Sequence, residues 1–344
     1  MDNLNGYKAF EPGMICKGKQ YQENTDYEEE GGEICEKGMM HYCVNPFDVL
    51  NFYPLVNDSG KVSDFAAVKS LEEPVSGDGG KFATKKIHIG VKLGLPGFVK
   101  ACIDYLKEET IGKAPNSTVS SGNYAQIGSS GYSAKIGSSG YSAQIGSSGN
   151  SAQIGSSGYY AKIGSSGYYA KIGSSGYYAQ IGSSGDYAQI GSSGYYAQIG
   201  SSGDYAQIGS SGDYAQIGSS GDSAQIGSSG DSAKIGSSGD SAKIGSSGDY
   251  AQIGSSGYYA QIGSSGYYAQ IESSGEDSVI CCAGHDSAVK AKAGSWITLA
   301  EWEYSEAKNR CVPKCVKTEY VDGERIKADA WYKLIDGEFT EVSP

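Results

Sequence analysis

A nine-residue repeat dominates this chain. Residues 123–275 are 17 consecutive copies of x-[Tyr/Ser]-Ala-[Gln/Lys]-Ile-Gly-Ser-Ser-Gly, the last with Glu272 in place of the first Gly. Isoleucine recurs every ninth residue from Ile127 to Ile271 without an insertion. A flexible Gly/Ser linker would not keep Ala and Ile two residues apart in every copy. The repeat therefore predicts a periodic, ordered structure in which neighbouring copies stack on one another.

The alternation inside each copy indicates a short strand. Ala and Ile share one parity and point inward, whereas the Tyr/Ser and Gln/Lys positions share the other and point outward. The Gly-Ser-Ser-Gly segment is typical of a tight corner, with glycines that tolerate unusual backbone angles. We therefore predict a mainly β chain with a parallel β-solenoid. Two copies, or 18 residues, per coil suit the small Ala/Ile core, and three copies, or 27 residues, are the alternative.

The flanks divide the chain into four regions. We expect a small α+β domain over residues 1–110, an atypical first coil over 111–122, the solenoid over 123–275, and a solenoid cap with an antiparallel β-rich domain over 276–344. Ile280 and Val289 continue the nine-residue spacing into the cap. Expected N-terminal elements are strands over 7–10, 16–21 and 84–90, a helix after Pro46 and an amphipathic helix over 97–109. In the C-terminal region, Asp-Gly pairs at 322–323 and 336–337 predict hairpin turns.

Charge and composition exclude several classes of protein. The formal net charge is −12, with 39 acidic and 27 basic residues, which argues against direct binding of nucleic acid. No run is long and apolar enough for a membrane span, and residues 1–54 carry no secretory pattern. We therefore expect reduced thiols for the eight cysteines and a location in the cytoplasm.

Two groups of residues have the chemistry of metal ligands. Cys16, Cys35, His41 and Cys43 lie within 28 residues and offer a Cys₃His zinc site, although their spacing matches no common finger. Cys281, Cys282 and His285 offer a second group with Cys311 and Cys315. The alternative in both cases is ordinary thiols in a folded domain, and we predict no cofactor, with zinc as the lesser possibility.

Catalytic signals are weak. The chain has three histidines, His41, His88 and His285, and none has an orienting third group at a recognisable spacing. Residues 39–53 are similar to the second strand and following helix of ADP-ribosyltransferase-like folds, with residues 7–10 as the first strand. No catalytic glutamate accompanies that likeness. We predict a protein that is not an enzyme and assign no catalytic residues, with an N-terminal enzyme as an alternative.

The outward positions of the repeat form the predicted binding surface. Stacked coils set Tyr, Gln and Asp side chains in ladders, and exposed tyrosine rows favour contacts with proteins or glycans. The ladder residues are Tyr160, Tyr169, Tyr178, Tyr187, Tyr196, Tyr205, Tyr214, Tyr250, Tyr259, Tyr268, Asp204, Asp213, Asp222, Asp231, Asp240 and Asp249. The position that carries calcium-binding Asp in nonapeptide β-rolls is Ala here, and the Thr arrays of ice-binding surfaces are absent. The six consecutive Asp copies suggest regular rows of carboxylates, which either limit aggregation or imitate DNA.

Motifs along the chain resemble a group of uncharacterised phage and prophage proteins. The similar segments are Gly6–Phe10 (GYKAF), Cys16–Tyr21 (CKGKQY), His41–Leu50 (HYCVNPFDVL), the IGSSG nonapeptides, WITLAEW and VDGERIKADAWYKL. The resemblance spans the whole chain and implies a mobile-element origin with a host-directed or virion role. It supplies no known activity and no site residues.

These observations predict a phage-derived solenoid that binds a host protein through its ladder faces, as an inhibitor of host defence, with self-association as a further contact. One alternative is a virion or surface rod that serves as a spacer or glycan-binding adhesin. Another is an acidic mimic of DNA.

Overall fold

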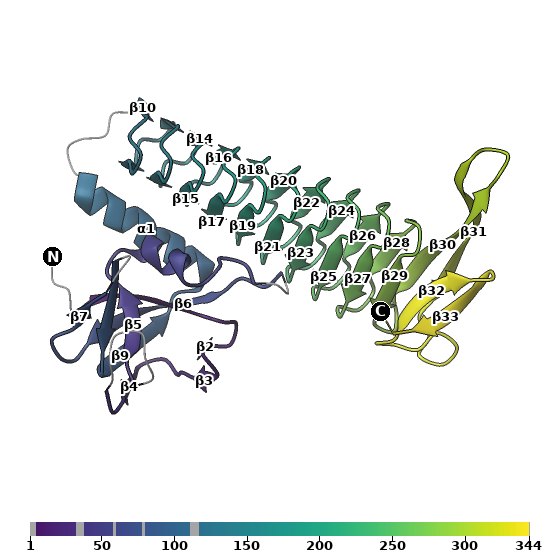
Figure 1. The fold of residues 1–344 in the computed structure, drawn as a ribbon, viewed down its shortest axis with the longest axis horizontal. Helices are drawn as coiled ribbons and strands as arrows, with labels where there is room; N and C mark the ends of the chain where they lie inside the picture. The colour runs from purple at the N-terminus through teal and green to yellow at the C-terminus, as the bar shows by residue number, and fades with distance from the viewer. Residues whose placement is uncertain (1–4, 32–37, 58–59, 78–79, 111–116, 344) are drawn as a thin grey trace.

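The computed structural model describes residues 5–31, 38–57, 60–77, 80–110 and 117–343, and it is an extended rod with one domain against its side and a β-rich segment at its C-terminal end (Figure 1). A small sheet domain precedes the rod in the chain. The rod itself is a parallel β-solenoid, and an antiparallel β-rich segment follows it. The predicted fold class is therefore confirmed.

The N-terminal domain is built on a seven-stranded antiparallel sheet in the order β4-β9-β6-β1-β5-β8-β7. Its strands are β1 (Asn5–Phe10), β4 (Thr25–Glu28), β5 (Met40–Cys43), β6 (Asp64–Ser70), β7 (Val75–Ser76), β8 (Lys81–Thr84) and β9 (Lys86–Lys92), and β2 (Ile15–Cys16) pairs separately with β3 (Lys19–Gln20). The helix expected after Pro46 is a 3₁₀ helix, η1 (Pro46–Asn51), whose first turn is capped by Asn45. The amphipathic helix is α1 (Gly94–Thr110), which begins three residues before its predicted start.

Alternate repeats enter two opposite sheets of twelve strands each. The first sheet contains β10 (Ser117–Ser120), β12 (Lys135–Ser138), β14 (Gln153–Ser156), β16 (Lys171–Ser174), β18 (Gln189–Ser192), β20 (Gln207–Ser210), β22 (Gln225–Ser228), β24 (Lys243–Ser246), β26 (Gln261–Ser264), β28 (Val279–Cys282), β30 (Trp296–Ser305) and β31 (Arg310–Tyr320). The second contains β11 (Gln126–Ser129), β13 (Gln144–Ser147), β15 (Lys162–Ser165), β17 (Gln180–Ser183), β19 (Gln198–Ser201), β21 (Gln216–Ser219), β23 (Lys234–Ser237), β25 (Gln252–Ser255), β27 (Gln270–Ser273), β29 (Ala288–Ala291), β32 (Trp331–Ile335) and β33 (Glu338–Val342).

Each coil contains two repeats. Ile190 on β18 pairs with Ile208 on β20, and Ile199 on β19 pairs with Ile217 on β21, so residues 18 apart lie above one another. The 18-residue coil is confirmed, and the 27-residue alternative is wrong. The repeat Ala and Ile side chains fill the space between the sheets, where Ala197 and Ile199 have no exposed surface. The thin core follows from the small volume of this pair.

The last glycine of each repeat is needed for space and not for an unusual backbone angle. No repeat glycine has a positive φ, so the expectation of backbone-permissive glycines at the corner is wrong. A Cβ on Gly203 would lie 2.1 Å from the carbonyl oxygen of Gly185 one coil earlier, and the same close approach recurs along the rod. The first glycine of each repeat lies instead on the outer face of a strand.

The C-terminal cap ends the parallel stacking. In one sheet β30 pairs parallel with β28 and antiparallel with β31, while in the other β32 pairs antiparallel with β29 and β33. The Asp336-Gly337 pair forms the predicted hairpin turn between β32 and β33, and both residues have positive φ. Asp322-Gly323 is not a hairpin turn, because it belongs to a loop between β31 and β32, which lie in different sheets.

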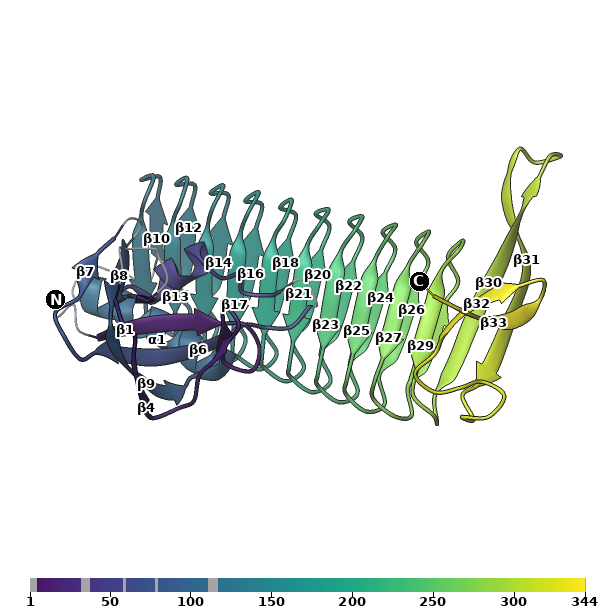
Figure 2. The same ribbon diagram turned by 60° about the horizontal axis from the view of Figure 1, so that its bottom comes forward.

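The N-terminal domain lies alongside the solenoid (Figures 1 and 2). It packs against the side of the rod. Helix α1 contacts β11, β13, β15 and β17 of the second sheet. We call this second sheet the covered sheet and the opposite one, which begins with β10, the open sheet.

The two glycine positions predict opposite effects of the same substitution. Gly203→Ala places a methyl group against backbone and should lower the free energy of unfolding by about 1–3 kcal/mol, the usual range for overpacking. Gly209→Ala on the open sheet should be neutral or stabilising by about 0.4–1 kcal/mol, because the unfolded chain loses freedom and the described residues leave space there. Urea unfolding followed by circular dichroism compares the two variants. Equal destabilisation would contradict the assigned roles.

Candidate binding surfaces

The corners between the two sheets form two edges of the rod, and alternate repeats contribute to opposite edges. The predicted tyrosine ladders therefore lie along two opposite edges. Tyr160, Tyr178, Tyr196, Tyr214, Tyr250 and Tyr268 follow strands of the open sheet and share one edge, whereas Tyr169, Tyr187, Tyr205 and Tyr259 follow strands of the covered sheet and share the other. The sequence shows no systematic difference between odd and even copies. Only the 18-residue length of the coil places their tyrosines on opposite edges.

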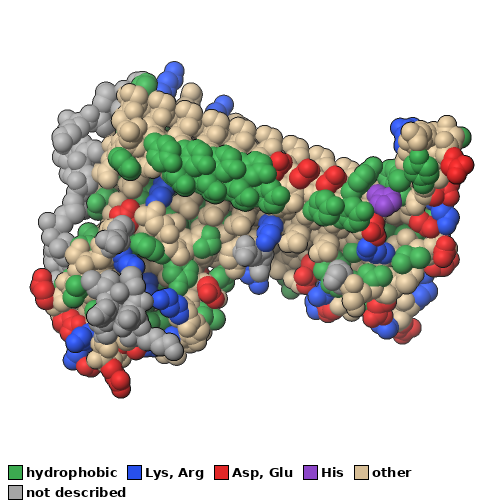
Figure 3. Space-filling model, viewed as in Figure 1, with side chains coloured by type: hydrophobic (Ala, Val, Ile, Leu, Met, Phe, Trp, Pro, Cys, Tyr) green, Lys and Arg blue, Asp and Glu red, His purple; other side chains and the backbone are tan. Residues whose placement is uncertain are grey.

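The first edge carries a dense group of rings, which we call the tyrosine block: Tyr141, Tyr159, Tyr160, Tyr177, Tyr178, Tyr195, Tyr196 and Tyr214. Equivalent rings stack along the rod, with centroids 5.1 Å apart and an interplanar angle of 1° for Tyr159 and Tyr177. Within a corner the two rings meet edge to face, as in Tyr177 and Tyr178 at 4.9 Å and 65°. Figure 3 shows the block as a continuous apolar band along the rod.

Stacking sets what the tyrosine block can present to a partner. Equivalent rings stack face to face along the rod, so the ring edges, with their hydroxyl groups, make up much of the surface left for a partner. Tyr159, Tyr177 and Tyr178 remain 36–38% exposed despite this packing. Side chains held on both sides lose little freedom when a partner binds, which makes such a surface suitable for protein contacts.

The packed rings also resist ionisation. The pKa values of Tyr159, Tyr177 and Tyr195 are raised, first by desolvation and then by the neighbouring tyrosines. A raised pKa in the folded state means that the stabilising contribution is complete below the unfolded value of 10.0 and is lost as pH rises through the folded value.

We predict that part of the tyrosine absorbance titrates above pH 10.0 in the folded protein. Thermal stability should fall over the same pH range. Replacing Tyr160, Tyr178 and Tyr196 by Ser removes like-charge neighbours and desolvating contacts, so the residual rings should titrate closer to the ordinary value. Ultraviolet difference titration compares the tyrosine titration of the wild-type protein and the variant, and thermal unfolding at each pH measures the loss of stability. An identical titration of the two proteins would contradict the assigned cause.

The aspartate run is likewise divided between the edges. Asp204, Asp222 and Asp240 lie on one edge and Asp213, Asp231 and Asp249 on the other, so the expected rows of carboxylates run along two opposite edges of the rod. In Figure 3, a short row of acidic side chains follows the tyrosine block along the rod.

Each row of carboxylates also has a structural role. Oδ1 of Asp222 accepts a hydrogen bond of 2.8 Å from the backbone N–H of Asp240 in the next coil, and Asp204 and Asp213 do the same for their successors. The corner changes conformation where aspartate first appears. At Tyr178 the backbone N–H donates to Tyr159 one coil earlier, whereas at Tyr187 it donates to Asp204 one coil later and φ becomes 54°.

Asp222→Ala should therefore lower the free energy of unfolding by about 1 kcal/mol, because it removes the acceptor for the Asp240 N–H. Asp222→Asn keeps an oxygen acceptor and should retain most of the stability. Parallel urea unfolding of the two variants tests this role. A loss as large for Asn as for Ala would show that charge, and not the hydrogen bond, is responsible.

Three of the four proposed zinc ligands line one cavity of about 250 Å³ in the N-terminal domain. Cys16, His41 and Cys43 share this cavity with Lys8, and Cys35 lies outside the described residues. Burial raises the pKa of Cys43 to about 12, and burial together with Lys8 and Lys81 lowers the pKa of His41 to about 4. At neutral pH Cys43 is thus a thiol, which is a poor nucleophile and metal ligand. Among the described residues, no three or more His, Cys, Asp or Glu side chains are arranged so that they could hold a metal ion.

The second set of cysteines does not converge. Cys281 is exposed on β28, Cys282 next to it is buried in the core, and His285 lies at a corner against Tyr267 with ring centroids 5.6 Å apart. Cys311 and Cys315 are on β31, where Cys315 donates a weak hydrogen bond to Glu301 at 3.6 Å. His88 is on the surface, with Nδ1 2.6 Å from Asp26 Oδ1.

Sequence reasoning missed a surface on the open sheet. The outward glycines of this sheet line a groove of about 1400 Å³ that runs from Val119 to Cys281. The Gly-Ser-Ser-Gly pattern predicts a corner for these glycines, although the alternation that places Gln outward and Ile inward also places the following Gly outward on the strand. That parity was the available signal.

The comparisons with known proteins bear on the N-terminal domain. Residues 4–101 match the model of a family described as a domain of unknown function (DUF7666). The match ends within α1, before the repeats begin. No curated protein and no solved structure matches the chain. Among the described residues, no helix has both the length and the apolar character needed to cross a membrane.

Proposed function

We propose that this chain is a non-enzymatic, phage-derived protein that binds a host protein through the tyrosine block and thereby inhibits a host function such as defence, acting in the host cytoplasm. The observation that carries the proposal is the row of stacked, partly exposed rings on one edge of the rod. Tyrosine is enriched at the energetically dominant positions of protein interfaces. The resemblance of the sequence motifs to phage and prophage proteins supports the origin.

The ring geometry favours a protein partner over a glycan. Sugar rings stack on exposed aromatic faces, but the faces in the block are occupied by neighbouring tyrosines at 5.1–5.5 Å. Outward hydroxyl groups and ring edges are better suited to hydrogen bonds and packing in a protein interface. The acidic mimic of DNA gains no comparable support, because the carboxylates are divided between two edges and bind backbone N–H groups.

The repeat itself supplies a matched pair of variants. Ser occupies the second repeat position in several copies, including Ser223 and Ser232, so Tyr→Ser at that position is compatible with the coil. The test variant replaces Tyr160, Tyr178 and Tyr196 in the block. The control replaces Tyr169, Tyr187 and Tyr205 on the opposite edge by the same residue.

We predict that tagged, nuclease-treated wild-type protein captures a stoichiometric host protein from bacterial lysate, identified by mass spectrometry. The block variant should bind that protein at least about tenfold more weakly, because each truncated anchor residue typically costs about 2 kcal/mol. The control should bind as wild type. Recovery of the bait alone, or equal binding by both variants, would refute the proposal and favour a virion or surface rod.

A further inference from the structure

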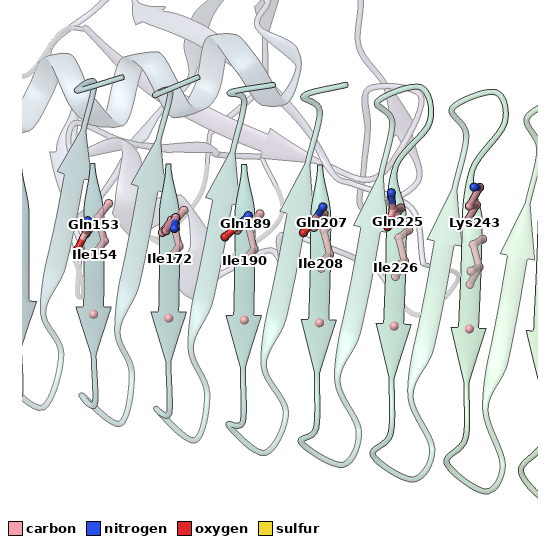
Figure 4. Close-up of a pocket in the computed structure, with 18 of the residues that line it drawn as sticks. Gln153, Ile154, Ile172, Gln189, Ile190, Gln207, Ile208, Gln225, Ile226 and Lys243 are labelled. Carbon is pink, nitrogen blue, oxygen red and sulfur yellow. The ribbon is translucent and has the colours of Figure 1, made fainter. Parts of the chain in front are cut away.

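The two sheets of the solenoid present the same groove to different surroundings. Their repeat strands share the sequence Gln/Lys-Ile-Gly-Ser, in which only the first and third residues point outward. The glycines form a strip without side chains, and the Gln/Lys side chains form a ridge beside it. Figure 4 shows this ridge on the open sheet, with Gln153, Gln189, Gln207, Gln225 and Lys243 in one row that crosses the strands.

On the covered sheet the glycine strip holds helix α1. A Cβ on Gly146 would lie 2.8 Å from Leu106, one on Gly182 would lie 3.1 Å from Val99, and one on Gly200 would lie 3.2 Å from Leu95. Side chains at these strand positions would push the helix away. The glycines therefore allow the apolar side of α1 to approach the backbone of the sheet.

The spacing of helix and coil explains this fit. One helical turn rises about 5.4 Å, and adjacent strands are about 4.8 Å apart, so each turn meets roughly one coil. The inserted residues follow the pattern i, i+4, i+8 and i+11, represented by Leu95, Val99, Ile103 and Leu106. The strip thus accepts one apolar side chain or pair of side chains per coil.

The Gln/Lys ridge supplies polar contacts to the occupant. Gln198 Oε1 accepts a hydrogen bond from the Leu55 N–H at 2.9 Å, and Gln180 Nε2 donates to the Leu50 carbonyl at 3.3 Å. Lys162 Nζ donates to the Phe47 carbonyl at 2.9 Å, and the nearby Asp48 carboxylate partly offsets the lowering of the Lys162 pKa by burial. The N-terminal domain therefore presents two features to the covered sheet: the apolar face of α1 in the glycine strip and, from η1, the acidic side chain of Asp48 beside the ridge.

The groove on the open sheet lacks an occupant within the described part of the chain. Cβ atoms placed on Gly155, Gly173, Gly191, Gly209, Gly227, Gly245 and Gly263 would meet nothing within 4 Å there. Glycine weakens a strand, and a solvent-facing strand position favours β-branched residues. The ridge carries Lys135, Lys171 and Lys243, and no acidic residue lines the described groove. Its charge is therefore complementary to an acidic partner, unlike that of the whole chain at −12.

We propose that the open-sheet groove binds an amphipathic α-helix of a partner protein. The helix carries apolar residues at i, i+4, i+8 and i+11 and acidic residues on the flank that faces the lysines. The ten strands from β10 to β28 span roughly 43 Å, enough for a helix of nearly 30 residues. The site contains no tyrosine of the block, and it is independent of the proposed function.

The chain provides the probe for a direct test. A fluorescent peptide with the sequence of residues 93–110, carrying Gly97→Ala and Cys102→Ala, keeps the apolar pattern of α1 and has higher helix propensity. The covered sheet stays occupied by the tethered α1, whose effective concentration is far above that of added peptide. The control peptide carries Val99→Asp and Ile103→Asp in addition.

Binding of the probe to full-length protein is measured by fluorescence anisotropy. The double variant Gly191→Val and Gly209→Val fills the open groove, and Gly254→Val is the matched control because it makes the same change on the covered sheet beyond α1, where the Cβ contact is 4.0 Å. We expect saturable binding that falls at least about tenfold in the double variant and is unchanged in the Gly254→Val protein. The control peptide should not bind.

Three results would overturn the proposal. They are the absence of saturable probe binding, equal binding to the double variant, and self-association of the wild-type protein that the double variant abolishes. The last result would identify a second copy of the chain as the occupant. Circular dichroism of each variant establishes that the solenoid has folded. The Tyr160, Tyr178 and Tyr196 variant should bind the probe as wild type, which separates failure of this site from failure of the tyrosine block.

Discussion

The close stacking of successive coils is the constraint on which the rest of the structure depends. The corner glycines bring backbone against backbone, so that a methyl group on Gly203 would lie 2.1 Å from a carbonyl oxygen. With the corners in contact, each repeat strand pairs in register with the strand 18 residues away, and Ile lies on Ile along the repeats. The small Ala/Ile core is sufficient because each coil shares its hydrogen bonds and apolar contacts with two neighbours.

The same stacking turns a one-dimensional repeat into surfaces with distinct chemistry. Copies that are adjacent in sequence lie on opposite sheets, and copies two apart lie side by side. As a result, the tyrosine block gathers on one edge, although its members alternate in sequence with copies that face the other way. Aspartates at the corners contribute to the stack itself, since each carboxylate accepts the N–H of the next coil. The edges are therefore partly structural and partly available for contact.

The lateral position of the N-terminal domain makes the two sheets unequal. Helix α1 and the segment around Leu55 occupy the glycine strip of the covered sheet, and their polar neighbours bind its Gln/Lys ridge. The open sheet has the same strand sequence without such a cover among the described residues. The rod thus offers a stacked aromatic edge and a glycine groove, which differ in shape, polarity and the kind of partner they fit.

The sequence by itself determined the solenoid, because period-two alternation of Ala and Ile within an uninterrupted nine-residue register is compatible with few other structures. It also indicated the C-terminal continuation through Ile280 and Val289, whose strands extend the two sheets. Only the tertiary structure decided which tyrosines and aspartates share an edge, since that depends on the coil length and not on residue type. It also decided the place of α1. The periodicity of Leu95, Val99 and Leu106 predicts an apolar helix face, but the partner of that face is set by glycines at least forty residues away, through contacts that no local pattern encodes.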